Sequence, residues 1–456
     1  MSTPRPRVVI VGAGFAGLAA AKALRRVPVQ VTLVDQHDYH TFKPFLYQVA
    51  TALLAADDAA YPIRGEVRRL ANVSFMLATV TGVDLDAKAV DTDQGRLPYD
   101  YLVLAAGAVN AYFGHPEIAG RCLALNNLPE ALQLRNTILA RFEAAAWATD
   151  PAERARLLSF AVVGGGPTGT EFAGALAELV AGTLAKDFPG LRRSEVSITL
   201  AEGSRHPLSA FARPLQAAAH RTLERKGVQV RSKVMAADVD ETGLRLKDGS
   251  VIPAATVVWA AGVRAAHLVD GLGLPLGSHE RIKVTPTCQL DGRPEVFAVG
   301  DLAEIPQHGQ PLPMLAQVAI QSGRHAARGI EVLLRAGTPE PFRYRDLGTM
   351  AAVGRGFAVA DIGPVKLSGL AGFLAWLVVH IARIAGMRTR WLVLTNWVSG
   401  YLFRNRPVRF IAGPRTPQEA GSAIPPGRGS RSPGRDTDRI PGRDARTPNT
   451  RSGRNR

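Results

Sequence analysis

The sequence predicts an α/β fold made of two Rossmann-like domains, one inserted in the other, followed by a C-terminal region of amphipathic helices. Three observations predict it. A glycine turn follows a short β-like run at residues 12–17 and again at 164–169. An Ala-Ala-Gly sequence ends a later β-like run at 105–107 and again at 260–262. Two short apolar runs lie near the C-terminus. From the first glycine of the turn to the glycine of Ala-Ala-Gly is 95 residues in one copy and 98 in the other, which indicates two homologous domains.

The first glycine turn has the features of a dinucleotide site. Val8–Val11 predicts the strand before it, and the alanine-rich stretch after it predicts a helix. Gly12 permits the tight turn, Gly14 lets the backbone approach a pyrophosphate, and Gly17 lets the helix pack closely on the sheet. Asp35 ends the next β-like run, where its carboxylate would accept hydrogen bonds from ribose hydroxyls. The alternative is a tight strand–helix turn without a ligand.

The second turn repeats this arrangement with a different acid. Its glycines are Gly164, Gly166 and Gly169, and the next β-like run ends at Glu202. A carboxylate at this place favours the free 2′-hydroxyl of NADH, because a 2′-phosphate would meet like charge. Arg205 lies close by in sequence and keeps NADPH as an alternative. Two dinucleotide sites in one chain indicate hydride transfer from a nicotinamide to a flavin.

A third β-like run, Val296–Val299, leads into Gly300 and Asp301. We expect this run to join the sheet of the first domain, so that the second domain is inserted in the first. Asp301 would then reach the ribityl chain of the flavin; the alternative is an ordinary turn aspartate. The expected domains are a first FAD-binding part (1–154), an NADH-binding domain (155–268), a second FAD-binding part (269–340), a membrane-associating region (341–412) and a tail (413–456).

Three side chains are candidates for the reaction itself. Glu171 follows the second glycine turn, and we expect it in the first turn of the next helix. There it would either complement the helix dipole or contact the nicotinamide and take part in proton transfer. Gln317 and Gln321 lie one turn apart on a helix predicted between residues 311 and 330.

The cysteine content limits the chemistry. The two cysteines, Cys122 and Cys288, form no Cys-x-x-Cys pair, which excludes a dithiol redox centre and a cysteine-rich metal site. We expect two buried thiols and no metal site. Without a dithiol, electrons must leave the flavin for a diffusible acceptor.

The C-terminal quarter is basic and contains two short apolar runs. Of the formal net charge of +16, residues 341–412 contribute ten Lys or Arg against two acids. The runs 367–382 and 391–403 are shorter than the roughly 20 residues that span a bilayer. Residues 367–412 are therefore expected to lie on a membrane surface, which favours a lipid-soluble acceptor such as quinone. The alternative is a core or dimer-interface helix. Residues 413–456, rich in Gly, Pro and Arg, predict a disordered basic tail.

With these features, the chain resembles the type II NADH dehydrogenases. These are single-subunit FAD proteins that pass electrons from NADH to quinone without pumping protons. The resemblance covers roughly residues 7–412 and includes both glycine turns, residues 39–50 and residues 300–303. Its most specific part is Ala316–Gln321, which is similar to the Ala-Gln-x-Ala-x-Gln sequence of the family's quinone site.

The resemblance implies a role for each matching residue. FAD would be bound by the first-domain set Gly12, Gly14, Gly17, Asp35, Gly107, Gly300 and Asp301, and Lys43 would lie near the edge of the flavin. NADH would be bound by Gly164, Gly166, Gly169, Glu202 and Gly262. Glu171 would lie near the nicotinamide, with Gln317 and Gln321 at the quinone site. The family also implies a homodimer attached to the cytoplasmic face of the cell membrane through residues 367–412, and the absence of a recognisable secretory signal agrees with that side.

Two departures and two rival functions accompany this interpretation. Lys43 stands where a neutral polar residue is expected, and the family does not usually carry a tail like 413–456.

One rival function is that of a relative of the sulfide:quinone reductases, which would use Cys122 and Cys288 close to the flavin. The other is a non-catalytic redox sensor whose basic tail binds nucleic acid. Nucleic acid is disfavoured because the tail lacks aromatic residues for stacking.

Overall fold

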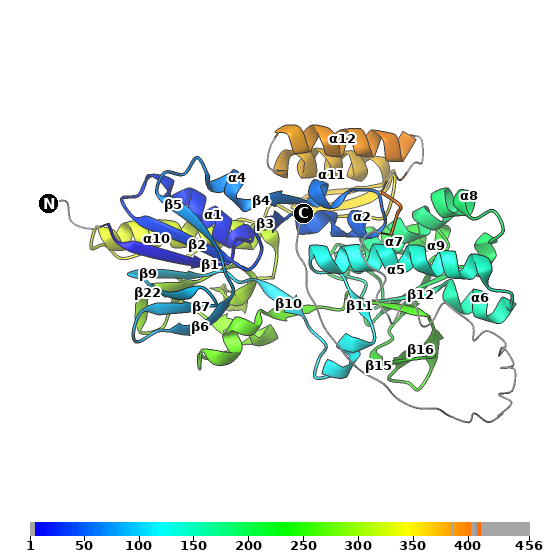
Figure 1. Cartoon of the computed structure of the whole chain (residues 1–456), viewed down its shortest axis with the longest axis horizontal. Coiled ribbons are helices and arrows are strands. Elements are labelled where there is room, and N and C mark those ends of the chain that lie inside the picture. The colour runs from blue at the N-terminus through cyan, green and yellow to red at the C-terminus, as the bar shows by residue number, and fades with distance from the viewer. Residues whose placement is uncertain (1–4, 385–386, 403–405, 407, 412–456) are drawn as a thin grey trace, which may run out of the picture. The chain divides into compact units, whose positions relative to one another are not determined.

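The computed structural model describes residues 5–384, 387–402, 406 and 408–411 (Figure 1). Its contacts divide the chain into two compact units, residues 1–412 and 413–456. The predicted tail is the second unit and lies outside the described residues. The first unit contains both predicted dinucleotide-binding domains and the C-terminal helices.

The first domain is built on a six-stranded sheet. In order across the sheet, the strands are β21 (Gln289–Leu290), β22 (Arg293–Ala298), β9 (Tyr101–Leu104), β1 (Arg7–Val11), β2 (Gln30–Asp35) and β5 (Val73–Leu77). All neighbours are parallel except β21 and β22. Because β22 pairs with β9 across nearly 190 residues of chain, the insertion of the second domain is confirmed.

Two helices pack tightly on this sheet. They are α1 (Phe15–Ala23) and α10 (Ala316–Leu334). Gly323 lies at their crossing, where a Cβ would stand 2.1 Å from the backbone oxygen of Ala16. Only glycine permits this approach, which fixes the helix that carries Gln317 and Gln321 against the first glycine turn.

The second domain has a five-stranded parallel sheet. The strands lie in the order β11 (Leu123–Ala124), β18 (Thr256–Trp259), β12 (Ser159–Val163), β13 (Ser197–Glu202) and β14 (Gln229–Ser232). Its helices include α5 (Leu128–Trp147), α6 (Pro151–Leu157), α7 (Pro167–Leu179), the π-helical turn η4 (Val180–Leu184), α8 (Ala185–Asp187) and α9 (Arg213–Arg225). Since β11 belongs to this sheet, the boundary expected at residue 154 falls after its first strand.

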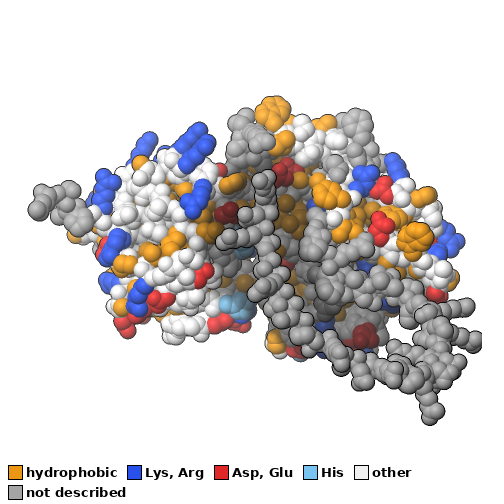
Figure 2. All heavy atoms as spheres, in the orientation of Figure 1, with side chains coloured by type: hydrophobic (Ala, Val, Ile, Leu, Met, Phe, Trp, Pro, Cys, Tyr) orange, Lys and Arg blue, Asp and Glu red, His pale blue; other side chains and the backbone are white. Residues whose placement is uncertain are grey.

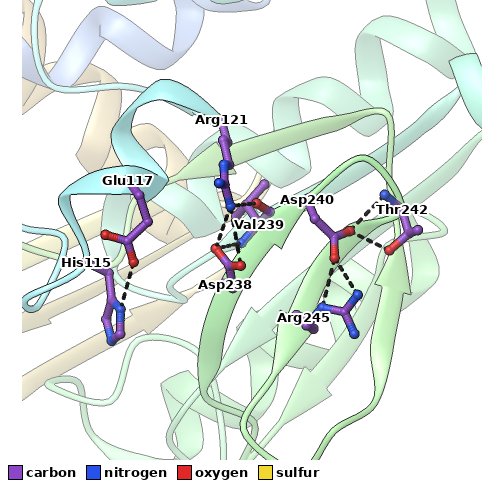
Figure 3. A network of polar contacts seen from close by, with 8 residues as sticks. All are labelled: His115, Glu117, Arg121, Asp238, Val239, Asp240, Thr242 and Arg245. Carbon is purple, nitrogen blue, oxygen red and sulfur yellow. Dashed lines mark hydrogen bonds and ion pairs between the residues drawn. The ribbon is translucent and has the colours of Figure 1, made fainter.

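Each domain also carries a small antiparallel sheet, so the internal repeat extends beyond the glycine turns. In the first domain it is β6 (Val80–Asp84), β7 (Ala89–Thr92) and β8 (Gly95–Pro98); in the second it is β15 (Ala236–Asp240), β16 (Gly243–Leu246) and β17 (Val251–Pro253). Arg121 donates to Asp238 and to the Val239 backbone oxygen, joining the segment before β11 to the second small sheet (Figure 3). Asp240, Thr242 and Arg245 form a second cluster on the same sheet. These exposed contacts stabilise the surface of the second domain.

The two domains are joined by a two-stranded antiparallel ribbon. Its strands are β10 (Ala108–Asn110) and β19 (Val263–Ala265). Each strand directly follows the Ala-Ala-Gly sequence of its own domain. The Ala-Ala-Gly sequences of the two domains therefore lead into the same ribbon.

Short elements complete the body. They are β3 (Tyr39–Thr41), α2 (Leu46–Ala50), α3 (Ala56–Ala59), β4 (Ala60–Pro62), α4 (Ile63–Val67), β20 (Ile282–Lys283), β23 (Ala303–Glu304), β24 (Pro306–Gln307) and β25 (Gln310–Pro311).

The C-terminal region is a three-stranded sheet with two helices. The strands are β26 (Thr349–Ala352), β27 (Ala358–Ile362) and β28 (Val365–Ser368), and the helices are α11 (Gly369–Arg383) and α12 (Met387–Leu402). None of the described helices is long and apolar enough to cross a membrane. Trp376 and Trp397 are almost fully buried against Phe45, and Trp397 donates to Gln48 Oε1 at 2.7 Å. One face of this helix pair is thus part of the protein core.

Candidate active site

The first glycine turn has the geometry that a dinucleotide needs. Gly12 has a φ of +99°, and a Cβ there would lie 2.5 Å from the Ala105 oxygen. A Cβ on Gly17 would collide with the Gly12 oxygen, whereas the position above Gly14 is open. Asp35 accepts a hydrogen bond from the Ala13 backbone nitrogen at 2.6 Å, so its carboxylate closes one side of the turn. The open glycine and the fixed acid fit the pyrophosphate and ribose of FAD.

Asp301 lies where a second part of FAD would be held. The backbone nitrogen of Gly300 donates to Ser322 Oγ at 3.1 Å, which ties this turn to α10. Asp301 Oδ1 is buried and has no hydrogen-bond partner among the described residues. Burial raises the pKa of the Asp301 carboxyl, and the charges of Lys43 and Arg281 oppose that rise. A buried acceptor without a partner is costly in the protein alone and fits a ligand hydroxyl.

Lys43 lies close enough to this carboxylate for the two charges to interact. Its Nζ donates to Asn126 Oδ1 at 2.9 Å, while Asn126 Nδ2 donates to the Ala108 oxygen at 3.0 Å. Surrounding protein atoms desolvate the Lys43 ammonium and lower its pKa although the residue as a whole is exposed, and the charges of Asp301 and Glu130 counter that effect. Because the Ala108 carbonyl accepts from the Asn126 nitrogen Nδ2, the Asn126 oxygen Oδ1 is the end of the amide that faces Lys43. Asn126 was not singled out from the sequence, because only the fold brings it next to Lys43, 83 positions earlier in the chain.

His40 is a second residue that was not singled out from the sequence. It is buried, and its Nδ1 donates to the Ala13 backbone oxygen at 2.9 Å. Its ring contacts Phe15 and Tyr61. Burial lowers the pKa of His40, so the ring stays neutral and supports the first glycine turn from behind.

The second glycine turn repeats the first in detail. Gly164 has a φ of +100° and a Cβ there would lie 2.5 Å from the Ala260 oxygen. Gly166 is open, as Gly14 is, and Gly169 is as closely packed as Gly17. Glu202 accepts from the Gly165 nitrogen at 2.5 Å, the counterpart of the contact between Asp35 and Ala13. These residues fit NADH in the way that the first set fits FAD.

Glu171 lies deeper in its helix than the sequence suggested. It is the fifth residue of α7, which has no acid in its first turn, so complementation of the helix dipole there is wrong. Its Oε1 accepts from the Ala352 backbone nitrogen of β26 at 3.0 Å. Burial raises the pKa of the Glu171 carboxyl to about 8. The side chain therefore holds a proton at neutral pH, at the contact between the second domain and the C-terminal sheet.

Gln317 and Gln321 point to the same part of the C-terminal region. Gln317 Nε2 donates to the Gly348 oxygen at 2.9 Å, and its Oε1 is buried without a partner in the described part of the chain. Gln321 both donates to the Arg345 oxygen at 2.9 Å and accepts from the Arg345 nitrogen at 3.0 Å. Gln317 thus has an acceptor available for a ligand, whereas the Gln321 amide is occupied by backbone.

One extended segment links all three candidate catalytic residues. Residues 345–352 contact Gln321 through Arg345, Gln317 through Gly348 and Glu171 through Ala352. At about 3.3 Å per residue, the contacts at 348 and 352 are roughly 13 Å apart along the chain. No sequence pattern marks this segment, because its contacts are made by backbone atoms.

The cysteines are placed unfavourably for redox chemistry. Cys288 is fully buried in the core of the first domain, and Cys122 is partly buried against the core of the second. Burial raises the pKa of both thiols to about 12. Since the thiolate is the nucleophile, neither is prepared for persulfide chemistry.

Comparisons with known proteins agree with this geometry. The family model described as pyridine nucleotide-disulphide oxidoreductase matches residues 6–323, and the NDH2 C-terminal domain matches residues 347–406. The chain therefore belongs to the pyridine nucleotide-disulphide oxidoreductases. Within that class it is a member of the type II NADH:quinone oxidoreductases, since it is 39% identical to the Mycobacterium tuberculosis enzyme Ndh over 417 residues, covering 88% of this chain and 89% of that one.

Two examples illustrate the solved structures that share the fold. The structure of NDH2 from Plasmodium falciparum in complex with NADH has a TM-score of 0.82 at 18% identity, covering 89% of this chain and 99% of that one. The sulfide:quinone oxidoreductase of Aquifex aeolicus has a TM-score of 0.65 at 18% identity, covering 86% and 92%. Both matches show the fold alone.

Proposed function

We propose that this chain oxidises NADH at the second glycine turn and reduces a membrane quinone beside Gln317, Glu171 and the segment 345–352. As a type II NADH:quinone oxidoreductase it is an FAD enzyme that passes electrons from NADH to quinone without pumping protons. The observation that carries the placement of the quinone site is the convergence of three candidate side chains on one segment.

The residues divide the work between the two domains. Bound FAD supplies the ability to accept a hydride and to pass electrons on. Asp35 and Gly14 would hold its adenosine half, while Asp301, with Lys43 beside it, would hold the ribityl side. Glu202 would hold the adenosine ribose of NADH and disfavour a 2′-phosphate.

Quinone reduction needs two protons as well as two electrons, and Glu171 is suited to hold one of them. Its raised pKa, about 8, keeps the proton on the carboxyl at neutral pH. The Ala352 nitrogen fixes Oε1, which leaves Oε2 as the oxygen that would carry the proton. A group with a pKa near the working pH can both give and regain a proton.

The outer face of the helix pair supports attachment to a membrane surface. On α11, the side chains of Leu370, Leu374 and Val378 are 53–69% exposed and follow one another at intervals of four residues. On α12, Trp391 and Val398 are exposed and seven residues apart. Hydrophobic side chains reach the surface over this part of the molecule in Figure 2. A stripe of this kind inserts into the headgroup layer without spanning it.

Attachment to the cytoplasmic face of the cell membrane and assembly as a homodimer belong to the same proposal. Flotation with lipid vesicles tests the attachment: Leu374→Glu with Val378→Glu should abolish flotation and leave NADH oxidation by a short-chain quinone intact. Equal flotation of this variant would contradict attachment through α11. Sedimentation of the purified chain tests the dimer.

The test of the function is an assay of NADH oxidation with a short-chain quinone, run beside NADPH. We expect bound FAD, turnover with NADH, and much slower turnover with NADPH because of Glu202. A chain that binds no FAD, or does not reduce quinone, would defeat the proposal. Replacing Cys122 and Cys288 by serine should leave turnover unchanged, which separates this function from sulfide oxidation.

A further inference from the structure

A basic pocket lies away from both dinucleotide turns, where α12 meets the second domain. It has a volume of about 430 Å³. Its lining comes from the turn that follows α2, from α7 and η4, from the end of α9, and from the C-terminal region. The lining residues are Leu53, Ala177, Glu178, Ala181, Gly182, Thr183, Arg225, Lys226, Arg355, Gly400 and Arg406.

Among the described residues that line this basic pocket, cations outnumber acids. Four lining side chains are cationic, namely Arg225, Lys226, Arg355 and Arg406, and among the described residues that line it the acid is Glu178 alone. Glu178 Oε1 accepts from Lys226 Nζ at 2.5 Å, and its Oε2 lies 4.0 Å from the Arg406 guanidinium. One carboxylate is thus shared by two cations, and this lining carries a formal charge of +3 (four cations less one acid). A concave site of one sign attracts and concentrates ions of the other sign.

The pocket is also held in shape by its own contacts. Arg406 is buried and donates to the backbone oxygens of Thr51 and Ala175. The Arg355 nitrogen donates to Glu178 Oε1 at 2.5 Å, and a Cβ on Gly354 would lie 2.4 Å from that same oxygen. Three lining residues belong to the π-helical turn η4, a local expansion of the helix that often marks functional sites. Arg406 and Lys226 are therefore held in place in the pocket wall, while Arg225 and Arg355 are exposed.

We propose that the basic pocket binds a phosphate group. A phosphate offers several strong acceptor oxygens, which match guanidinium and ammonium donors in number and charge. Two sources share this chemistry. One is the headgroup of an anionic phospholipid, because Gly400 is in the last turn of α12, whose exposed face is apolar; this source rests on the proposed membrane attachment. The other is free phosphate.

The test measures binding directly on the full chain with FAD bound. Arg225 and Arg355 are exposed, so Arg225→Gln with Arg355→Gln removes two charges without disturbing the core. Arg192→Gln with Arg221→Gln is the matched control, since it removes two exposed charges outside the lining. Inorganic phosphate is titrated by calorimetry at low salt. In parallel, flotation compares phosphatidylcholine vesicles with vesicles that also contain phosphatidylglycerol.

Two results would support the proposal. In one, the native chain and the control pair bind inorganic phosphate, and the pocket pair binds it at least tenfold more weakly. In the other, inorganic phosphate does not bind, but the native chain and the control pair prefer vesicles with phosphatidylglycerol and the pocket pair loses that preference. The first result assigns free phosphate as a sufficient ligand, and the second assigns the lipid headgroup.

Two results would overturn it. Either the native chain neither binds phosphate nor distinguishes the vesicles, or the control pair loses binding as fully as the pocket pair. Turnover with NADH and a short-chain quinone is recorded on the same samples. If turnover is lost but binding of phosphate or of the vesicles is retained, the proposed function is contradicted and the proposed phosphate site is not.

Discussion

At the scale of the single residue, Glu171 holds a proton whose presence can be tested by replacement. The pKa of its carboxyl is about 8 in the folded chain against a usual 4.5, so the folded state binds the proton more tightly than the unfolded chain does. Glu171 therefore makes the free energy of unfolding fall as pH rises between these values, by about 1.4 kcal/mol per pH unit. Glu171→Gln should remove this slope and lower quinone turnover.

Denaturant unfolding from pH 5 to 8 measures the slope. Glu153→Gln is the control, because its side chain is 39% exposed and the hydrogen bond from Arg156 lowers the pKa of its carboxyl. The same slope in the native chain and in Glu171→Gln would show that Glu171 is not buried with its proton.

The motif residues were predictable from the sequence, whereas most of their partners were not. Asp35 and Glu202 each lie beside their glycine turn, as the sequence suggested, but their hydrogen bonds from the backbone of that turn were not predicted. Glu171 was predicted as a candidate, but its helix position was wrong and its contact with the Ala352 nitrogen was unforeseen. His40 and Asn126 were missed because one supports a backbone oxygen and the other a side chain distant in sequence.

At the scale of elements, the strands and helices of the two dinucleotide folds followed from periodicity, and the C-terminal sheet did not. The run that forms β26 has small residues and little alternation of polar and apolar side chains. The sequence therefore does not predict its position next to α7 and α10. A C-terminal region of amphipathic helices was predicted from two short apolar runs, and α11 and α12 lie at those runs. The sequence could not show that Trp376 and Trp397 pack on Phe45, because only the fold brings these residues together.

A glycine in the segment 345–352 allows a test of the quinone site. Gly348 has a φ of +86°, and a Cβ there would lie 2.6 Å from the Asp361 oxygen. Gly348→Ala should displace the carbonyl that binds Gln317 and reduce kcat/KM for quinone roughly tenfold, equivalent to about 1.4 kcal/mol. Reduction of bound FAD by NADH alone, measured by stopped flow, should be unchanged.

The matched control for that variant is Gly363→Ala. Gly363 lies in the same sheet with a φ of +55° and no neighbouring atom within 4 Å of a Cβ. If the two variants lost quinone turnover equally, the contact with Gln317 would not be the cause.

The docking of α12 is tested at its buried tryptophan. Trp397→Phe removes the donor to Gln48 Oε1, a side chain that is fully buried, and leaves that oxygen unpaired. The free energy of unfolding should fall by about 2–4 kcal/mol. Trp391→Phe on the same helix, where the side chain is 62% exposed, should change it little. Comparable losses in the two variants would contradict the packing of α12 on α2.

At the scale of the whole molecule, the internal repeat made the architecture predictable. Two copies of one motif set required two sheets, and the return of β22 beside β9 required insertion. The ribbon of β10 and β19 was not predictable, because three-residue strands carry no periodic signal. The second domain also begins earlier than expected, at β11. This strand has two residues, which is too short for a strand to be recognised in a sequence.

Truncation tests how the body depends on its C-terminal region. Removing residues 413–456 should leave FAD content and turnover unchanged, because residues 1–412 form one compact unit. Ending the chain at residue 366 removes α11 and α12 and cuts β28, which should abolish turnover even with a short-chain quinone. Full turnover of the shorter chain would show that the helices serve only for attachment.

The contacts of residues 345–352 have a practical consequence for anyone who wishes to work with this enzyme away from lipid. The same stretch of chain that leads to the surface helices also contacts Gln317, Gln321 and Glu171 of the proposed reaction site. We therefore expect a truncation that removes the apolar outer face of α11 and α12 to impair the proposed reaction site as well. A detergent-free preparation has to be engineered by replacing the outward side chains of α11 and α12 with polar ones, with the inward tryptophans left in place.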